Sequence, residues 1–406
     1  MSTASQDAVV IVAAARTPLG AFQGELSGLS APELGAVAIR AAVERAGLAP
    51  MQVEELLMGC VLPAGLGQAP ARQAALAAGL PQSVACTTVN KVCGSGMKAA
   101  MLAHDLLLAG SAGVVVAGGM ESMSNAPYLL PKARSGLRLG HGQVLDHMFL
   151  DGLEDAYSAE NRGRLMGSFA EDCAAHYAFD REAQDAYAMA STTRAQAAMR
   201  DGAFDWEITP VTLSDRQGER EIAADEQPPK ARLDRISLLK PAFRKDGTVT
   251  AANASSISDG AAALVLMRES TARRLGCRPL ARVVAHATHA QAAAWFTTAP
   301  VGAIEKVLEK AGWLAGEVDL WEINEAFAVV AMAAMKDLAL PHERVNVHGG
   351  ACALGHPIGA SGARILVSLI GALRRHRMRR GVASLCIGGG EATAMAISLV
   401  DEADTA

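Results

Sequence analysis

The chain has 406 residues, of which half are hydrophobic and only 4% are aromatic. A chain of this length exceeds the size at which a single core stops growing, so we expect two or more packed units. Its wealth of Ala, Gly, Val and Leu is typical of layered α/β proteins and not of β-sandwiches. The net charge of −5, the pI near 6.1 and the absence of a long basic run exclude a nucleic-acid-binding surface.

The cysteines indicate a reducing compartment. There are seven, at irregular spacing and without the close pairs of a zinc knuckle. The N-terminus enters an apolar run almost at once, which leaves no room for a signal or transit segment, and no stretch approaches the ~18 apolar residues of a membrane helix. We therefore expect a soluble, cytoplasmic protein with free thiols.

Short β-branched runs alternate with Ala/Leu-rich segments of helical spacing. In chain order, residues 8–15 predict a buried strand, 31–46 and 98–108 predict helices, and 113–119 predict another strand. This alternation predicts βαβ units. The sequence then becomes polar, which predicts an excursion with helices near 166–178 and 181–199. The predicted domains are an N-terminal half (1–124 plus 249–277), an inserted loop domain (125–248) and a C-terminal half (278–406).

The two halves repeat one scheme. "AAVERAGLAPMQVEELLMG" resembles "KVLEKAGWLAGEVDLWEIN", and farther on a Gly/Ser-rich turn, a helix and a strand ending in glycines occur in both halves. Cys93 follows Gly47 at nearly the spacing with which His356 follows Gly312. If the halves pack about a pseudo-twofold axis, two loops at helix starts bring Cys93 and His356 together.

The chemistry of these two side chains supports the pairing. The N-terminus of a helix stabilises a thiolate, so we expect a lowered pKa for Cys93. Pro357 suits the first turn of the following helix and presents His356 at the loop edge, where a neutral, proton-accepting imidazole is favoured. A neutral base beside a thiol is a nucleophile pair.

Several long motifs carry a family resemblance. "NKVCGSGMKA", "VVAGGMESMS", "GTVTAANASSISDGAAALVLM", "NEAF", "GHPIGASGAR" and "CIGGG" resemble, in the right order and over nearly the whole chain, the signature blocks of thiolases. The resemblance is closest to the branch of acetyl-CoA C-acetyltransferases. It implies an α/β thiolase fold with two βαβαβαββ halves in a five-layer αβαβα arrangement and an inserted loop domain.

The resemblance also implies roles for individual residues. Cys93 matches the nucleophile that becomes acylated, His356 the base that activates it, and Cys386 the acid/base that acts on the second substrate. Asn324 matches the residue that holds a water in one oxyanion hole, which His356 completes. The backbone N–H groups of Cys93 and Gly388 match the second hole. The implied reaction is the reversible condensation of two acetyl-CoA molecules to acetoacetyl-CoA and coenzyme A.

Substrate contacts follow in the same way. Ser255 matches a serine that contacts the pantetheine arm, Phe327 a wall of the tunnel, and Leu165 and Met166 border the acyl pocket. The positive charges of Lys230, Arg232 and Arg235 suit the phosphates of coenzyme A, although a solvated loop explains them equally well. No metal or cofactor is implied, because the coenzyme A thioesters are substrates. Residues 127–145 resemble a tetramerisation loop, which predicts a homotetramer made of two dimers.

Several alternatives stay open. Leu165 stands where biosynthetic relatives often carry histidine, so a degradative 3-ketoacyl-CoA thiolase of broader chain length remains possible. Asn324 also suits a helix N-cap before "EAFAVVAMAAM". A non-catalytic lipid-binding relative would lack part of the catalytic set, and a ketoacyl synthase would use two histidines. A nicotinamide-dependent dehydrogenase is a further class, which "GGG" at 388–390 supports weakly. The remaining cysteines fit packing roles: Cys60, Cys86, Cys173, Cys277 and Cys352.

Overall fold

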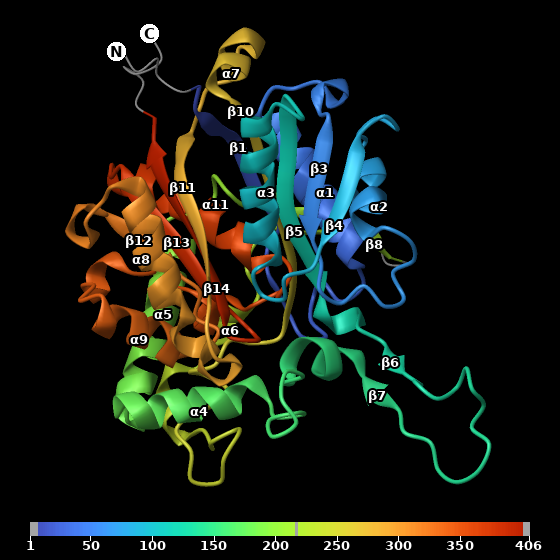
Figure 1. Ribbon diagram of the computed structural model, residues 1–406, viewed down its shortest axis with the longest axis vertical. Coiled ribbons are helices and arrows are strands. Elements are labelled where there is room, and N and C mark those ends of the chain that lie inside the picture. The colour runs from blue at the N-terminus through green and yellow to red at the C-terminus, as the bar shows by residue number, and fades with distance from the viewer. Residues whose placement is uncertain (1–6, 216–217, 401–406) are drawn as a thin grey trace.

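The computed structural model describes residues 7–215 and 218–400 (Figure 1). The strands are β1 Val9–Arg16, β2 Gly20–Ala21, β3 Glu55–Gly59, β4 Ala85–Val89, β5 Val114–Ser122, β6 Tyr128–Leu129, β7 Leu145–Asp146, β8 Val211–Asp215, β9 Gly218–Ile222, β10 Ser258–Arg268, β11 Ala281–Ala290, β12 Leu320–Ile323, β13 Arg380–Ile387 and β14 Glu391–Leu399. The α-helices are α1 Ala31–Arg45, α2 Pro70–Ala77, α3 Ser95–Ala109, α4 Met166–Tyr177, α5 Arg181–Arg200, α6 Gln227–Lys230, α7 Glu269–Leu275, α8 Ala299–Ala311, α9 Ala328–Asp337, α10 Ala351–Leu354 and α11 Ser361–His376.

The strand order shows the internal repeat directly. In the first half β3, β5, β10 and β1 are neighbours, with a parallel pair followed by two antiparallel pairs. In the second half β12, β13, β14 and β11 repeat the same order and the same directions. The pairing of β1 with β11 is brief, and it joins the two sets into one ten-stranded sheet, whose two halves we call the first and the second sheet. The predicted repeat is confirmed.

The halves differ at one edge. In the first half β4 pairs with β3 in parallel, whereas the corresponding pairing in the second half is a single bridge between Trp321 and Val345. Asn346 explains the difference, because its φ of +49° turns the chain out of the extended conformation. Its side-chain amide then donates to and accepts from the backbone of Ile323 at 2.8 Å each, in place of a strand neighbour.

Helices and sheets alternate in five layers. One apolar cluster joins α1 and α2 to the outer face of the first sheet, and another joins α8 and α9 to the outer face of the second. The cluster between them contains α3 and α11 with the inner faces of both sheets. These two helices form the middle layer, where α11 is mostly buried and α3 is partly exposed toward its C-terminal end. Both lead back to candidate site residues at their N-terminal ends.

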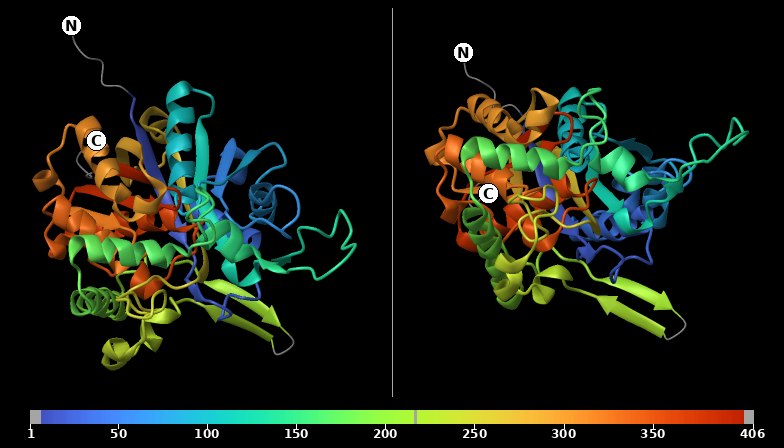
Figure 2. Two further views of the ribbon diagram at one scale, coloured as in Figure 1. Left: turned by 60° about the horizontal axis from the view of Figure 1, so that its bottom comes forward. Right: turned by 90° about the horizontal axis from the view of Figure 1, so that it is seen from below.

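The chain leaves the sheets between β5 and β10. It forms the β6–β7 and β8–β9 hairpins, which project from the body, and the helices α4, α5 and α6 beneath the second half (Figures 1 and 2). The predicted helices at 166–178 and 181–199 are confirmed as α4 and α5. Across the described ranges, every helix is too short or too polar to cross a membrane.

Candidate active site

Cys93 lies in a tight turn between β4 and α3. The turn closes through hydrogen bonds from the N–H of Gly94 to the carbonyl of Lys91 and from the N–H of Ser95 to that of Val92. Val92 has a φ of +46°, a conformation that a β-branched side chain rarely adopts. Such strain costs on the order of 1–3 kcal/mol and persists only where the surroundings impose it. No pattern in the sequence predicts this strained turn.

His356 lies in the matching turn of the second half. The Ser361 hydroxyl donates to the Pro357 carbonyl at 3.0 Å, so its oxygen accepts from Nδ1 of His356 at 2.6 Å. This assigns the proton of a neutral imidazole to Nδ1. Nε2 then carries the lone pair, and it has no partner among the described protein atoms. The ring is therefore oriented as a proton acceptor.

Glycines allow the two turns to meet. A Cβ on Gly96 would lie 2.8 Å from the backbone nitrogen of Ala363, and one on Gly362 would lie closer still to that of Met97. The first turns of α3 and α11 thus touch backbone to backbone. The predicted helix starts need one correction: α11 begins at Ser361 and not at Pro357, whose carbonyl instead accepts N–H groups in the turn before the helix.

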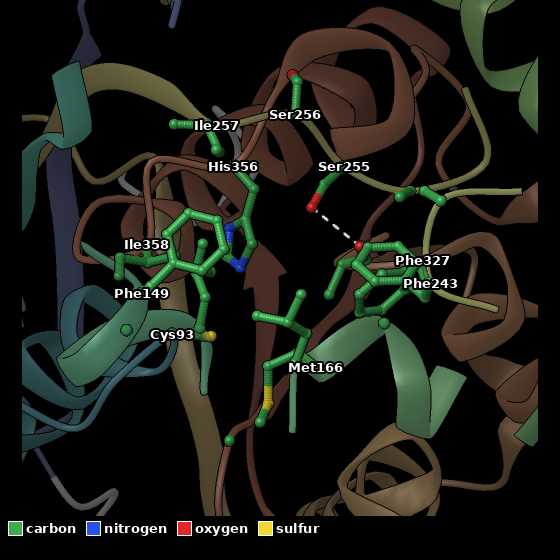
Figure 3. Close-up of a pocket in the computed structure, with 18 of the residues that line it drawn as sticks. Cys93, Phe149, Met166, Phe243, Ser255, Ser256, Ile257, Phe327, His356 and Ile358 are labelled. Atoms are coloured by element: carbon green, nitrogen blue, oxygen red, sulfur yellow. Dashed lines mark hydrogen bonds between the residues drawn. The ribbon is translucent and has the colours of Figure 1, made fainter. Parts of the chain in front are cut away.

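Cys93 and His356 face one cavity of about 360 Å³, as the repeat predicted (Figure 3). This volume lies within the range of small-molecule sites. Its wall is mainly apolar and combines the inserted segment with both halves. The lining residues are Cys93, Phe149, Gly152, Leu153, Leu165, Met166, Gly167, Ala242, Phe243, Ala251, Ala254, Ser255, Ser256, Ile257, Phe296, Ala326, Phe327, His356, Ile358 and Gly388.

Burial dominates the protonation states of the pair. Desolvation, with a smaller contribution from the charge of Arg364, lowers the pKa of His356 to about 3, so the predicted neutral imidazole is confirmed. The predicted lowering for Cys93 is wrong. Burial raises the pKa of its thiol to about 11, although the N–H groups of Gly388 and of Cys93 itself act in the opposite direction. At neutral pH the resting pair is a thiol and a neutral imidazole.

Asn324 directly follows β12 and is buried, with 1% of its surface exposed. Neither its Nδ2 nor its Oδ1 has a hydrogen-bond partner among the described protein atoms. An unpaired buried amide costs about 1–3 kcal/mol, so a polar ligand or water is expected to bind it. The alternative of a helix cap is wrong, since α9 begins at Ala328 with Phe327 at its N-cap.

Cys386 lies near the end of β13 and is fully buried. Its side chain is not among those that line the cavity, but its sulfur is near enough to Cys93 to interact electrostatically. Burial is the main cause that raises the pKa of the Cys386 thiol well above its usual value. Gly388, two residues on, directs its N–H to the Cys93 sulfur.

The predicted acyl and pantetheine residues line the cavity. Leu165 precedes α4 and Met166 begins it, while Ser255 and Phe327 lie in two segments joined by a bridge between Ala254 and Phe327. The Ser255 hydroxyl donates to the Ala326 carbonyl at 2.9 Å. Phe149, Phe243 and Ile358 were not predicted, because isolated apolar residues in loops give no pattern that distinguishes a ligand wall from a core.

The predicted phosphate-binding residues lie outside this cavity. Lys230, Arg232 and Arg235 are exposed on the segment that contains α6. Lys230 pairs with Glu226 at 2.7 Å, and Arg232 pairs with Asp234 at 3.0 Å. Two of the three cations therefore already have carboxylate partners.

A buried carboxylate that was not predicted from the sequence lies behind the site. Glu121, on β5, accepts the backbone N–H groups of Val61, Leu62 and Gly359. It thereby fixes the turn that follows His356 against the first half. Burial raises the pKa of Glu121 to about 7 despite these three donors.

The fold and this site define a class of enzyme: two repeated α/β halves with a cysteine and a neutral histidine on equivalent turns. The model of the thiolase N-terminal domain matches residues 9–270, and that of the C-terminal domain matches residues 277–399. The chain belongs to the thiolase family.

Its relatives cover nearly the whole chain. Acetyl-CoA acetyltransferase 1 of Arabidopsis thaliana is 52% identical over 97% of this chain and 95% of its own length. Acetyl-CoA acetyltransferase of Cupriavidus necator is 50% identical over 96% and 98%. Among solved structures, the Acat5 thiolase of Ascaris suum in complex with coenzyme A has a TM-score of 0.90 and 42% identity, covering 97% of this chain and 100% of that one.

Proposed function

We propose that this thiolase transfers the acetyl group of one acetyl-CoA to the methyl carbon of a second, giving acetoacetyl-CoA and coenzyme A, or runs the reverse thiolysis. The observation that carries the proposal is the arrangement of Cys93 and His356 at one apolar cavity. Two similar proteins named as acetyl-CoA acetyltransferases, and a similar structure that binds coenzyme A, support this choice of substrate.

The first half-reaction acylates Cys93. Nε2 of His356 takes the thiol proton while the sulfur attacks the thioester carbonyl, so a C–S bond to Cys93 forms as the C–S bond to coenzyme A breaks. Cys386 starts as a thiol and gives its proton to the departing coenzyme A thiolate. The site then holds an acetyl thioester on Cys93, an imidazolium and the Cys386 thiolate.

The second half-reaction forms the carbon–carbon bond. The Cys386 thiolate removes a methyl proton from the second acetyl-CoA, and the resulting carbanion attacks the acyl carbonyl on Cys93. Cys93 departs and regains its proton from His356. A raised pKa for Cys386 makes its thiolate a stronger base for this step. The free amide of Asn324 and Nε2 of His356 suit the enolate oxygen, and the N–H groups of Cys93 and Gly388 suit the oxyanion on the acyl carbon.

Chain length tests the substrate. The enzyme should cleave acetoacetyl-CoA with a kcat/KM well above that for eight-carbon 3-ketoacyl-CoA, measured as coenzyme A-dependent loss of substrate. Phe149, Leu165 and Met166 line the same cavity as the nucleophile, and their bulk limits the room for a longer acyl chain. Equal values for both substrates would instead assign a degradative thiolase of broad chain length.

We also infer where the coenzyme A phosphates bind, which oligomer the chain forms and in which compartment it works. Exposed cations on the segment with Lys230, Arg232 and Arg235 suit the nucleotide phosphates of coenzyme A, with Arg235 the first to test by substitution. The long β6–β7 excursion carries exposed apolar side chains, which supports a homotetramer. Free cysteines support a reducing compartment such as the cytoplasm.

A further inference from the structure

A cluster of histidine and carboxylate side chains lies where the two halves meet, away from the residues that line the catalytic cavity. His104 and Asp105 belong to α3 of the first half, and His286 belongs to β11, the first strand of the second. Within residues 7–215 and 218–400, these form the one group of three His, Cys, Asp or Glu residues whose ligand atoms lie close enough to hold a metal ion.

The three ligand atoms form a nearly equilateral triangle. Nε2 of His286 is 3.2 Å from Nδ1 of His104 and 2.9 Å from Oδ1 of Asp105, and the latter two atoms are 3.2 Å apart. A tetrahedral zinc ion with bonds of about 2.0–2.1 Å separates its ligands by about 3.3 Å. The observed triangle is therefore one face of such a tetrahedron after an expansion of a few tenths of an ångström.

The chemistry of the donors also fits zinc. Two imidazole nitrogens and one carboxylate oxygen leave a fourth position for water on the side where Asp105 is exposed. The ammonium of Lys310 donates to the His286 carbonyl at 3.0 Å, and its positive charge opposes the binding of a cation nearby.

A hydrogen-bonded triad is the alternative to a metal. Its weakness is the contact between the two histidines: if both imidazoles donate to Oδ1 of Asp105, their two N–H groups lie 3.2 Å apart with no lone pair between them. A cation accepts both lone pairs and the carboxylate at once. The sequence offers no signal for such a site, because His104 and His286 are 182 positions apart.

We propose that His104, Asp105 and His286 bind one zinc ion, which ties α3 to β11 and so fastens the first half to the second. The ion stabilises the contact between the halves and takes no part in acyl transfer. The proposal does not depend on the proposed substrate.

The test uses the full-length enzyme after dialysis against a chelator. Titration with Zn²⁺ should show one ion bound per chain and raise the unfolding midpoint by about 3–5 °C at a hundredfold excess over Kd. Co²⁺ should give the visible ligand-field bands of a tetrahedral N/O site, without a thiolate charge-transfer band. The substitutions His104→Gln, Asp105→Asn and His286→Gln should each weaken binding at least about tenfold.

The control is His141→Gln, which removes an exposed histidine from the long loop between β6 and β7 and should bind as the wild type does. Circular dichroism and thiolysis activity check that each variant is folded. Unchanged Zn²⁺ binding in all three cluster variants would overturn the proposal. So would binding that disappears only when Cys93 is alkylated, or the absence of a one-to-one complex at micromolar Zn²⁺.

Discussion

At the scale of single residues, the site depends on which groups hold protons at rest. His356 has its Nδ1 proton fixed by Ser361 and its Nε2 free, while the Cys93 and Cys386 thiols stay protonated because burial raises their pKa. The nucleophile is thus not a standing thiolate. The thiolate forms only when Cys93 gives its proton to His356 as the thioester is attacked. A thiol that is protonated at rest limits side reactions of the free enzyme.

The two cysteines should be separable by substitution. Cys93→Ser should abolish transfer of labelled acetyl groups from acetyl-CoA to the protein, because a serine hydroxyl ionises far less readily. Cys386→Ser should still become labelled on Cys93 but lose exchange of the acetyl methyl protons with solvent, with condensation slowed ~10²–10⁴-fold. Peptide mapping and proton exchange measure these outcomes. Exchange at the wild-type rate in Cys386→Ser would contradict its role as the base.

The buried imidazole should leave a signature in stability against pH. His356 has a pKa of about 3 in the folded protein, against an ordinary value of 6.5. As the pH falls, this imidazole therefore takes up a proton in the unfolded chain before it does so in the folded one. Stability is therefore full above about pH 6.5 and falls as the pH drops toward 3. Between pH 7 and 5, the wild type should lose about 2 kcal/mol relative to His356→Asn in denaturant unfolding. Other titrating groups are common to both proteins. If the unfolding free energies of the wild type and of His356→Asn changed in parallel with pH, the lowered pKa of His356 would be contradicted.

At the scale of elements, the contact between α3 and α11 sets the distance between nucleophile and base. Gly96→Ala places a methyl group 2.8 Å from the Ala363 nitrogen and should force the two helix starts apart. We expect a loss of about 10²-fold in kcat, because displacing catalytic groups by about 1 Å has that effect. Gly28→Ala is the control, since no atom lies within 4 Å of its added methyl group. A wild-type kcat in Gly96→Ala would contradict the idea that the contact between α3 and α11 sets the distance between nucleophile and base.

An ion pair joins the two catalytic loops. Lys91, two residues before Cys93, contacts Glu391, which follows the glycines after Cys386, at 2.5 Å. Both side chains are partly exposed, so Glu391→Gln should lower kcat/KM by no more than about fivefold, an effect of ~1 kcal/mol that weakens at high salt. The double exchange Lys91→Glu with Glu391→Lys should recover part of the loss. The control Glu317→Gln removes a surface pair with Arg380 at the opposite end of β13. Equal losses of kcat/KM in Glu391→Gln and in Glu317→Gln would contradict a role of the Lys91–Glu391 pair in positioning the catalytic loops.

At the scale of the whole molecule, the projecting β6–β7 excursion is the feature that the compact body does not explain (Figure 2). Leu137 and Leu139 are exposed on it, the latter by 99%, and exposed apolar groups of this kind mark association sites. If the proposed tetramer forms through this excursion, Leu137→Asp with Leu139→Asp should give dimers in sedimentation velocity, while activity per chain persists. Leu314→Asp, at an exposed leucine outside the excursion, is the control. An unchanged sedimentation coefficient would contradict the tetramer interface.

Much of the fold was predictable because it follows from local pattern. The β-branched runs, the Ala-rich helical spacing and the repeated glycine-rich turns determine the strands and helices of both halves, and α4 and α5 were predicted almost to the residue. The repeat also predicted that Cys93 and His356 lie together, since equivalent turns meet when two similar halves pack about a pseudo-twofold axis. Identical strand order in the two halves bears this out.

Other properties depend on surroundings that no local pattern records. The direction of the Cys93 pKa shift was predicted wrongly, because desolvation by segments distant in sequence outweighs the nearby N–H groups. The unpaired amide of Asn324, the apolar wall of Phe149 and Ile358, and the triangle of His104, Asp105 and His286 arise only when separate elements converge. The sequence by itself determined the elements and the reactive side chains, whereas tertiary packing decided their protonation and their neighbours, because burial and distance are properties of the folded chain.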